Sequence, residues 1–170
     1  PMLVAQVLNL LYNIVDRIYI ARIPGVGTTA LGAVGLCFPI IMIITAFSNL
    51  FGSGGAPLFS INRGKGDPKT ADTIMNTSFT MLCGGAVILM SVGMIFARPL
   101  LVLFGASSDA ITYAYPYLMI YLLGTLPSMI ATGMNPFINA QGYATTGMIS
   151  VVIGAIANII LDPFFIFVLH

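Results

Sequence analysis

Charged side chains are scarce in this sequence. Asp, Glu, Lys and Arg together make up 6% of its 170 residues, and no Glu occurs, whereas a soluble globular domain is about 25% charged. The formal net charge of +1 indicates no basic surface for nucleic acid. The scarcity of charge therefore argues against a soluble domain and a nucleic-acid partner, and it favours a protein that lies in a lipid bilayer.

Cysteine and histidine are also scarce. Cys37 and Cys83 lie in separate apolar runs, and His170 is the only histidine. The sequence has neither a disulfide framework nor the CxxC spacing of a zinc site, and no nucleophile stands beside a base. We therefore expect no enzyme built on a nucleophile–base pair, no organic cofactor and no Cys/His metal cluster.

Long apolar runs are what the sequence does contain. A helix that spans a bilayer needs about 20 mostly apolar residues, and about five runs satisfy this. They cover roughly residues 1–23, 31–61, 73–96, 111–139 and 144–169. The expected fold class is an all-α, polytopic membrane protein with about five transmembrane helices. The second run is longer than a bilayer requires, so we expect its helix to tilt or to project.

The connection at residues 62–69 is the most basic in the chain. Its Gly64-Lys65-Gly66-Asp67-Pro68 run lacks the spacing of a phosphate-binding loop, so we expect a tight turn. Positively charged loops favour the cytoplasmic side. On that assignment the first and fifth spans both run from the inside to the outside.

Two aspartates lie inside spans that otherwise suit lipid. Asp16 lies in the first span and Asp162 in the fifth, each about seven residues before its span ends. At 1.5 Å per residue both carboxylates are expected about 10 Å below the outer surface. An ionisable group in a membrane span is costly and usually marks an ion or proton pathway. A site facing a cavity between helices is the favoured interpretation.

The surroundings of Asp162 suit a small cation. Asn158 is four residues earlier and therefore on the same helix face. Pro163 follows directly, and a proline inside a helix frees a backbone carbonyl. A carboxylate with such carbonyls suits Na⁺, so a sodium site at Asp162 and Asn158 is one expectation, and the carboxylate alone suits a proton. The alternative is that Asp162 only makes a hydrogen bond to a neighbouring helix.

Polar residues also form a stripe on the first span. Asn9, Tyr12, Asn13 and Asp16 follow helical spacing, and such a stripe is expected to face the bundle interior or water. The alternative role is hydrogen bonding between helices. Arg17 is next to Asp16 but about 100° around the helix, so it either reaches outward or partners an acid.

A second polar pair lies near the end of the fourth span. Asn135 and Asn139 are four residues apart and flank Pro136. Cavity lining, or support for Asp162, is the functional interpretation. A plain helix end is the alternative, since Asn is common there.

Four stretches of the sequence, in order, resemble one family of membrane transporters. They are LYNIVDRIYIARIPGVGTTALGAVGLCFPI, SINRGKGDPKTAD, NPFINAQGYATTGM and ANIILDPFFIF. Together they resemble the N-terminal lobe of the multidrug and toxic compound extrusion (MATE) family, and within it the bacterial multidrug exporters. The resemblance covers essentially the whole chain and preserves the spacing between its elements.

The resemblance implies a multi-pass antiporter of twelve helices in two lobes, in the bacterial plasma (inner) membrane. It would expel cationic amphipathic small molecules in exchange for H⁺ or Na⁺. Residues 1–170 would then be part of the N-terminal lobe of a longer chain, with the sixth helix and the C-terminal lobe absent. Such a fragment is not expected to transport alone, because its partner lobe is missing.

The resemblance also implies roles for particular residues. The acid of the fifth helix is central to ion coupling in this family. The residues implied in ion coupling are Asp162, Asp16, Asn158 and Asn135. The residues implied in substrate binding are Tyr12, Asn9, Asp162 and Asn139.

Three other functions remain open on the sequence. A flippase for lipid-linked oligosaccharides, from the same wider superfamily, would use basic cavity residues. An intramembrane aspartyl protease would bring its two acids to about 3 Å. In a membrane scaffold, the two acids would contribute to stability and to nothing else.

Overall fold

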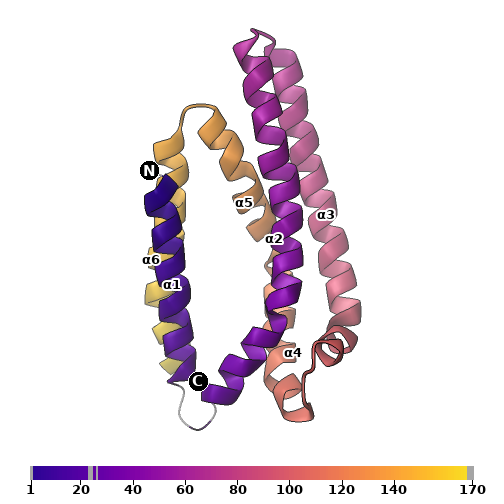
Figure 1. Ribbon diagram of the computed structural model, residues 1–170, viewed down its shortest axis with the longest axis vertical. Coiled ribbons are helices and arrows are strands. Elements are labelled where there is room, and N and C mark those ends of the chain that lie inside the picture. The colour runs from indigo at the N-terminus through magenta and orange to yellow at the C-terminus, as the bar shows by residue number, and fades with distance from the viewer. Residues whose placement is uncertain (1, 23–24, 26, 168–170) are drawn as a thin grey trace.

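The chain is all-α. The computed structural model describes residues 2–22, 25 and 27–167, and these contain helices and no strand. The helices are α1 (Met2–Ala21), α2 (Gly27–Gly64), α3 (Pro68–Leu103), α4 (Ser108–Leu123), α5 (Thr125–Ala140) and α6 (Ala144–Phe167). Figure 1 shows them as an upright bundle in which α2 and α3 are the longest members. The expected fold class is confirmed.

The α2–α3 hairpin is longer than a membrane requires. With 38 and 36 residues, the two helices extend about 57 and 54 Å, against a hydrocarbon core of about 30 Å. Figure 1 shows the tip of the α2–α3 hairpin rising beyond the other helices. Whether the second span tilts or projects in the membrane stays a prediction. The third helix also extends well beyond the predicted range 73–96, because it starts at Pro68 and continues to Leu103.

The connection between α2 and α3 is the tight turn expected from its sequence. Gly66 takes a positive φ of 78°, a conformation that suits glycine. Asp67 then caps α3: its carboxylate accepts a hydrogen bond of 3.1 Å from the backbone N–H of Thr70. Pro68 occupies the first helical position, where its missing N–H costs nothing.

The fourth predicted span differs from expectation because it is broken. Residues 111–139 were expected to form one helix, but α4 ends at Leu123 and α5 starts at Thr125, with a bend of 56° between them. Pro127 explains the position of the break. In a continuous helix it would remove a hydrogen bond and clash with Leu123, whereas in the first turn of α5 it is tolerated.

Helix length and composition identify the clearest membrane spans. Within the described residues, α2 and α3 are each long and apolar enough to cross a bilayer, and the bent α4–α5 pair adds up to one more. The first and last of the five predicted spans correspond to α1 and α6. That these two helices cross the membrane stays a prediction.

The helices form two groups. Helices α2 to α5 share a buried core that includes Cys37, Leu82, Leu118 and Met129. Helices α1 and α6 pack against each other as a separate pair, and Figure 1 shows both running in the same direction. Spans one and five are therefore parallel, as predicted from the number of spans between them.

The contact between α2 and α5 depends on two glycines. A Cβ atom added at Gly52 would overlap the backbone of Gly133, so α2 and α5 touch backbone to backbone. Ser48, one turn earlier on α2, donates its hydroxyl to the carbonyl of Met129 at 3.2 Å. The small residues at this crossing therefore permit close contact between the two helices.

Candidate functional site

Asp16 and Asp162 belong to neighbouring, parallel helices. Each lies five residues before the last residue of its helix, Ala21 in α1 and Phe167 in α6. Since α1 and α6 pack side by side, the two positions fall at a similar level of the pair. The Asp16 side chain is partly buried. The side chains of Asn9, Tyr12, Asn158 and Asp162, with Pro163, lie outside the described part of the structure, so their roles stay predictions.

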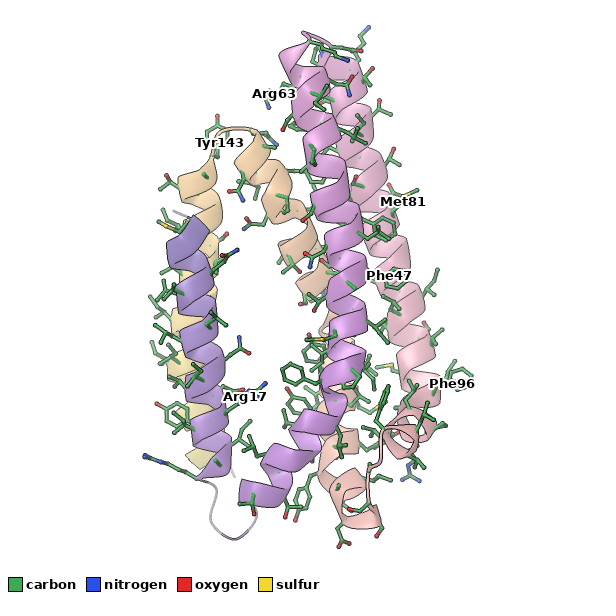
Figure 2. The ribbon with its side chains drawn as sticks, in the orientation of Figure 1. Arg17, Phe47, Arg63, Met81, Phe96 and Tyr143 are labelled. Carbon is green, nitrogen blue, oxygen red and sulfur yellow. The ribbon has the colours of Figure 1, made fainter. Side chains whose placement is uncertain are left out.

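Arg17 reaches from the α1–α6 pair to the other group of helices. Its guanidinium carbon lies 4.7 Å from the centroid of the Phe38 ring on α2, which is within the range of a cation–π contact. Figure 2 shows the side chain extending from α1 toward α2. Arg17 was expected either to reach outward or to partner an acid. In the structure it contacts an aromatic ring. Arg17 also acts electrostatically on its neighbour Asp16.

Tyr117 is a residue that the sequence did not single out. Tyr117 is partly buried and packs against the buried core of α2 to α5. The charges of Asp16 and Arg17 both act on its hydroxyl. Its spacing alone could not reveal this, because the neighbour comes from α1, about a hundred positions earlier in the chain.

The Cys37 thiol lies in the buried core of α2 to α5. It is buried, and its Sγ donates to the carbonyl of Ala114 on α4 at 3.6 Å. Cys83 is also free. The expected absence of a pairing between the two cysteines is therefore confirmed, and Cys37 serves to join α2 to α4.

Asn135 and Asn139 on α5 contact each other. Their neighbour on α6 lies at the opposite end of that helix from Asp162. Asn135 Nδ2 donates to the backbone carbonyl of Gly147 at 3.1 Å, and Asn139 Nδ2 donates to Asn135 Oδ1 at 2.9 Å. Gly147 is fifteen residues before Asp162 on the same helix, or about 22 Å along its axis. The structure thus brings the two asparagines together and keeps their contact on α6 far from the level of Asp162.

Two grooves open on the described surface, and neither contains a predicted site residue. One, of about 310 Å³, lies between α2 and α3 and includes Leu58, Thr77 and Ser78. The other, of about 400 Å³, is lined by α3 alone, including Asn76 and Thr80. Among the residues that the structure describes, no three His, Cys, Asp or Glu side chains gather as metal ligands. The chemistry available at the Asp16 level is therefore that of a carboxylate, a guanidinium and aromatic rings.

Known structures with this arrangement of helices are membrane transporters. One is the outward-facing conformation of a multidrug resistance MATE family transporter of the MOP superfamily, with a TM-score of 0.92 and 28% sequence identity. Another is a MOP superfamily transporter from Pyrococcus furiosus, also at 0.92 and 28%, whose structure is described as having a binding pocket of reverse polarity that suggests a different function. The fold is thus that of a multi-pass transporter, not of an enzyme.

The family follows from the sequence itself. The MatE family model matches residues 1–164, and the chain belongs to the MatE family. This confirms the resemblance drawn from the four stretches of sequence.

Two curated relatives have different cargoes in their names. The multidrug export protein MepA of Staphylococcus haemolyticus is 28% identical over 170 residues, which is 100% of this chain and 37% of that protein. The FAD transporter of Shewanella oneidensis is 25% identical over 167 residues, 98% of this chain and 36% of that protein. The chain therefore spans little more than a third of the length of its relatives, and it matches their N-terminal lobe.

Proposed function

We propose that this chain is part of the N-terminal lobe of a multidrug efflux antiporter in the bacterial plasma membrane. The full transporter would expel cationic amphipathic small molecules in exchange for H⁺ or Na⁺, and its second lobe would come from the same polypeptide. The observation that carries the proposal is the partly buried Asp16 on α1, level with Asp162 on the parallel helix α6. Two carboxylates at the same depth in a pair of membrane helices can attract and bind a cation.

The mechanism follows from competition for negative charge. An ionised Asp162 or Asp16 attracts a cationic drug, because opposite charges interact strongly where water is sparse. A proton or Na⁺ at the same carboxylate removes that attraction. Drug and ion then disfavour each other's binding by equal free energies. An inward ion gradient can therefore drive drug release to the outside.

The choice between H⁺ and Na⁺ depends on how many oxygens surround Asp162. Sodium needs several, and Asn158 with a carbonyl freed by Pro163 would help to supply them. A proton needs only the carboxylate. Measuring efflux with an imposed pH gradient and, separately, with an imposed Na⁺ gradient distinguishes the two ions.

The experiment is ethidium efflux from cells that express the full-length protein. Asp162→Asn and Asp16→Asn keep the shape of each side chain and remove its charge, so both are expected to abolish gradient-driven efflux at matched membrane expression. Asp109→Asn is the control, because Asp109 is an exposed residue in the first turn of α4. Efflux equal to wild type in both site variants would contradict the proposal.

An anionic cargo is the second candidate, and it includes a flippase for lipid-linked oligosaccharides. Arg17 beside Asp16 favours it, since a guanidinium binds phosphates well. The FAD transporter among the relatives and the structure with a reversed pocket polarity point the same way. Under this alternative, cells would export an anionic flavin and retain ethidium, and Arg17→Gln would stop the export.

A further inference from the structure

The contact between Arg17 and Phe38 uses the chemistry by which an aromatic ring recognises a cation. Its distance of 4.7 Å lies inside the limit of about 6 Å for attraction between a cation and a ring face. A planar cationic drug offers the same delocalised charge as a guanidinium and stacks on a ring in the same way. Phe38 therefore holds a side-chain cation that mimics the proposed substrate.

The ring is the fixed member of this pair. Phe38 is partly buried on α2, and the adjacent Cys37 is anchored to α4 through its hydrogen bond to Ala114. The Arg17 side chain is exposed, and a long arginine side chain has many rotamers. Arg17 can consequently leave the ring by rotation about its own bonds, while Phe38 stays in place.

Arg17 also lies next to the acid of the site. Its positive charge acts on Asp16 and so offsets part of the attraction that this carboxylate exerts on an incoming cation. Arg17 thus opposes a cationic substrate in two ways, by covering the ring and by repulsion. Figure 2 shows the side chain in the position from which it does both, between α1 and α2.

We propose that Arg17 is a tethered competitor for the cationic substrate, and that Phe38 is the ring for which the two compete. The inference rests on the proposed function and adds a determinant of specificity to it. Cations that stack well on an aromatic face displace the guanidinium and enter.

A purely structural role for the same contact makes a different prediction. If Arg17 only clamps α1 to α2, then losing either partner loosens the same contact, and both substitutions change binding in the same direction. If Arg17 competes with the substrate, then removing Arg17 and removing the ring have opposite effects. The sign of the two changes therefore separates a competitor from a clamp.

The test measures ethidium binding to the purified full-length protein by fluorescence anisotropy. Arg17→Gln is expected to lower the Kd two- to fivefold, and Phe38→Leu to raise it by a similar factor, as for a partly exposed cation–π contact. Phe38→Tyr keeps an aromatic face and is expected to bind like wild type. In a Phe38→Leu background, Arg17→Gln is expected to change the Kd less, because the two residues are coupled.

Arg98→Gln is the matched control. Arg98 is also exposed, and its guanidinium carbon lies 5.2 Å from the ring of Tyr115, so the variant removes the same charge and the same kind of contact from a position on α3. Its Kd is expected to equal that of wild type. A Kd lowered equally by Arg98→Gln would overturn the inference, since any loss of positive charge would then suffice.

The remaining outcomes are equally clear. If wild type binds ethidium and Arg17→Gln binds it no better, the inference fails while the proposed function stands. If Arg17→Gln and Phe38→Leu both weaken binding, the contact is a clamp and the inference again fails alone. If the wild-type protein binds no ethidium, the proposed function fails and the inference fails with it.

Discussion

Asn135 on α5 donates a hydrogen bond from Nδ2 to the backbone carbonyl of Gly147 on α6, at 3.1 Å. The bond ties the start of α6 to the α2–α5 group. The contact between Arg17 and Phe38 ties α1 to the same group near the other end of the pair. The α1–α6 pair thus makes a polar contact with the other helices near each of its ends. Movement of the pair during transport would have to break or repack at least one of them.

Gly147→Ala is expected to break the contact at the α5 end. A Cβ at Gly147 would lie 2.7 Å from Asn139 Oδ1 and 3.1 Å from Asn135 Oδ1, so both side chains must shift. Such overpacking typically costs about 1–3 kcal/mol. The measurement is the thermal unfolding of the full-length protein in detergent, in which Gly147→Ala is expected to lower Tm.

Gly154→Ala provides the comparison for that variant. It lies two turns further along α6, and a Cβ there would meet nothing within 4 Å. Since alanine favours helix over glycine by about 1 kcal/mol, Gly154→Ala is expected to keep or raise Tm. Equal Tm values for the two variants would show that the asparagine contact does not hold α6.

The two asparagines are expected to differ in their importance. Asn135 both donates to Gly147 and accepts from Asn139, so Asn135→Leu loses two hydrogen bonds, at about 0.5–1.5 kcal/mol each. The Gly147 carbonyl keeps its bond from Ser150 Oγ at 2.9 Å, whereas Asn139 Nδ2 loses its acceptor. Asn139 Oδ1 accepts no hydrogen bond from the described residues, so Asn139→Leu also removes an unsatisfied buried group and is expected to cost less than about 1 kcal/mol. Denaturant titrations of both variants give the comparison, and a larger loss for Asn139→Leu would contradict it.

Gly52→Ala is expected to separate α2 from α5. The added methyl group would overlap the backbone of Gly133, and two backbones cannot move apart without loss of the packing around Ser48 and Met129. A cost of about 2–3 kcal/mol is expected, at the upper end for overpacking. Gly54→Ala, on the same helix with nothing within 4 Å of the new Cβ, is the control. The fraction of folded protein in a fluorescence size-exclusion assay distinguishes them.

The sequence was sufficient for the features that depend on local chemistry. Apolar runs predicted the helices, and the glycine and proline residues of 64–68 predicted the turn that Asp67 caps. The number of predicted spans between α1 and α6 gave their parallel directions, because each crossing reverses the direction of the chain.

The features that the sequence did not reveal depend on which helices become neighbours. A pattern of tyrosines cannot show that the charges of Asp16 and Arg17, on another helix, act on Tyr117. The break at Gly124 was missed because the run 111–139 is long and mostly apolar and its three prolines look alike in the sequence. Pro116 and Pro136 lie inside α4 and α5, and only Pro127 lies in a first helical turn. Likewise, the spacing of Asn135 and Asn139 predicted that they share a face but could not assign Gly147 as their neighbour.

Asp67 is expected to make the α2–α3 turn sensitive to acid. Hydrogen bonds from the side chain and backbone of Thr70 hold the pKa of the Asp67 carboxyl below its usual value. Because the folded-state pKa is lowered, the stabilisation is fully present above the unfolded-state pKa of about 3.9 and is lost as the pH falls through the lower native value. Asp67→Asn keeps a good capping side chain but does not titrate, so Tm is expected to fall less steeply with acid than in wild type. Asp72→Asn, at an exposed position on the same helix, is the control and is expected to follow wild type. A wild-type acid dependence in Asp67→Asn would mean that this cap does not contribute to the pH dependence of stability.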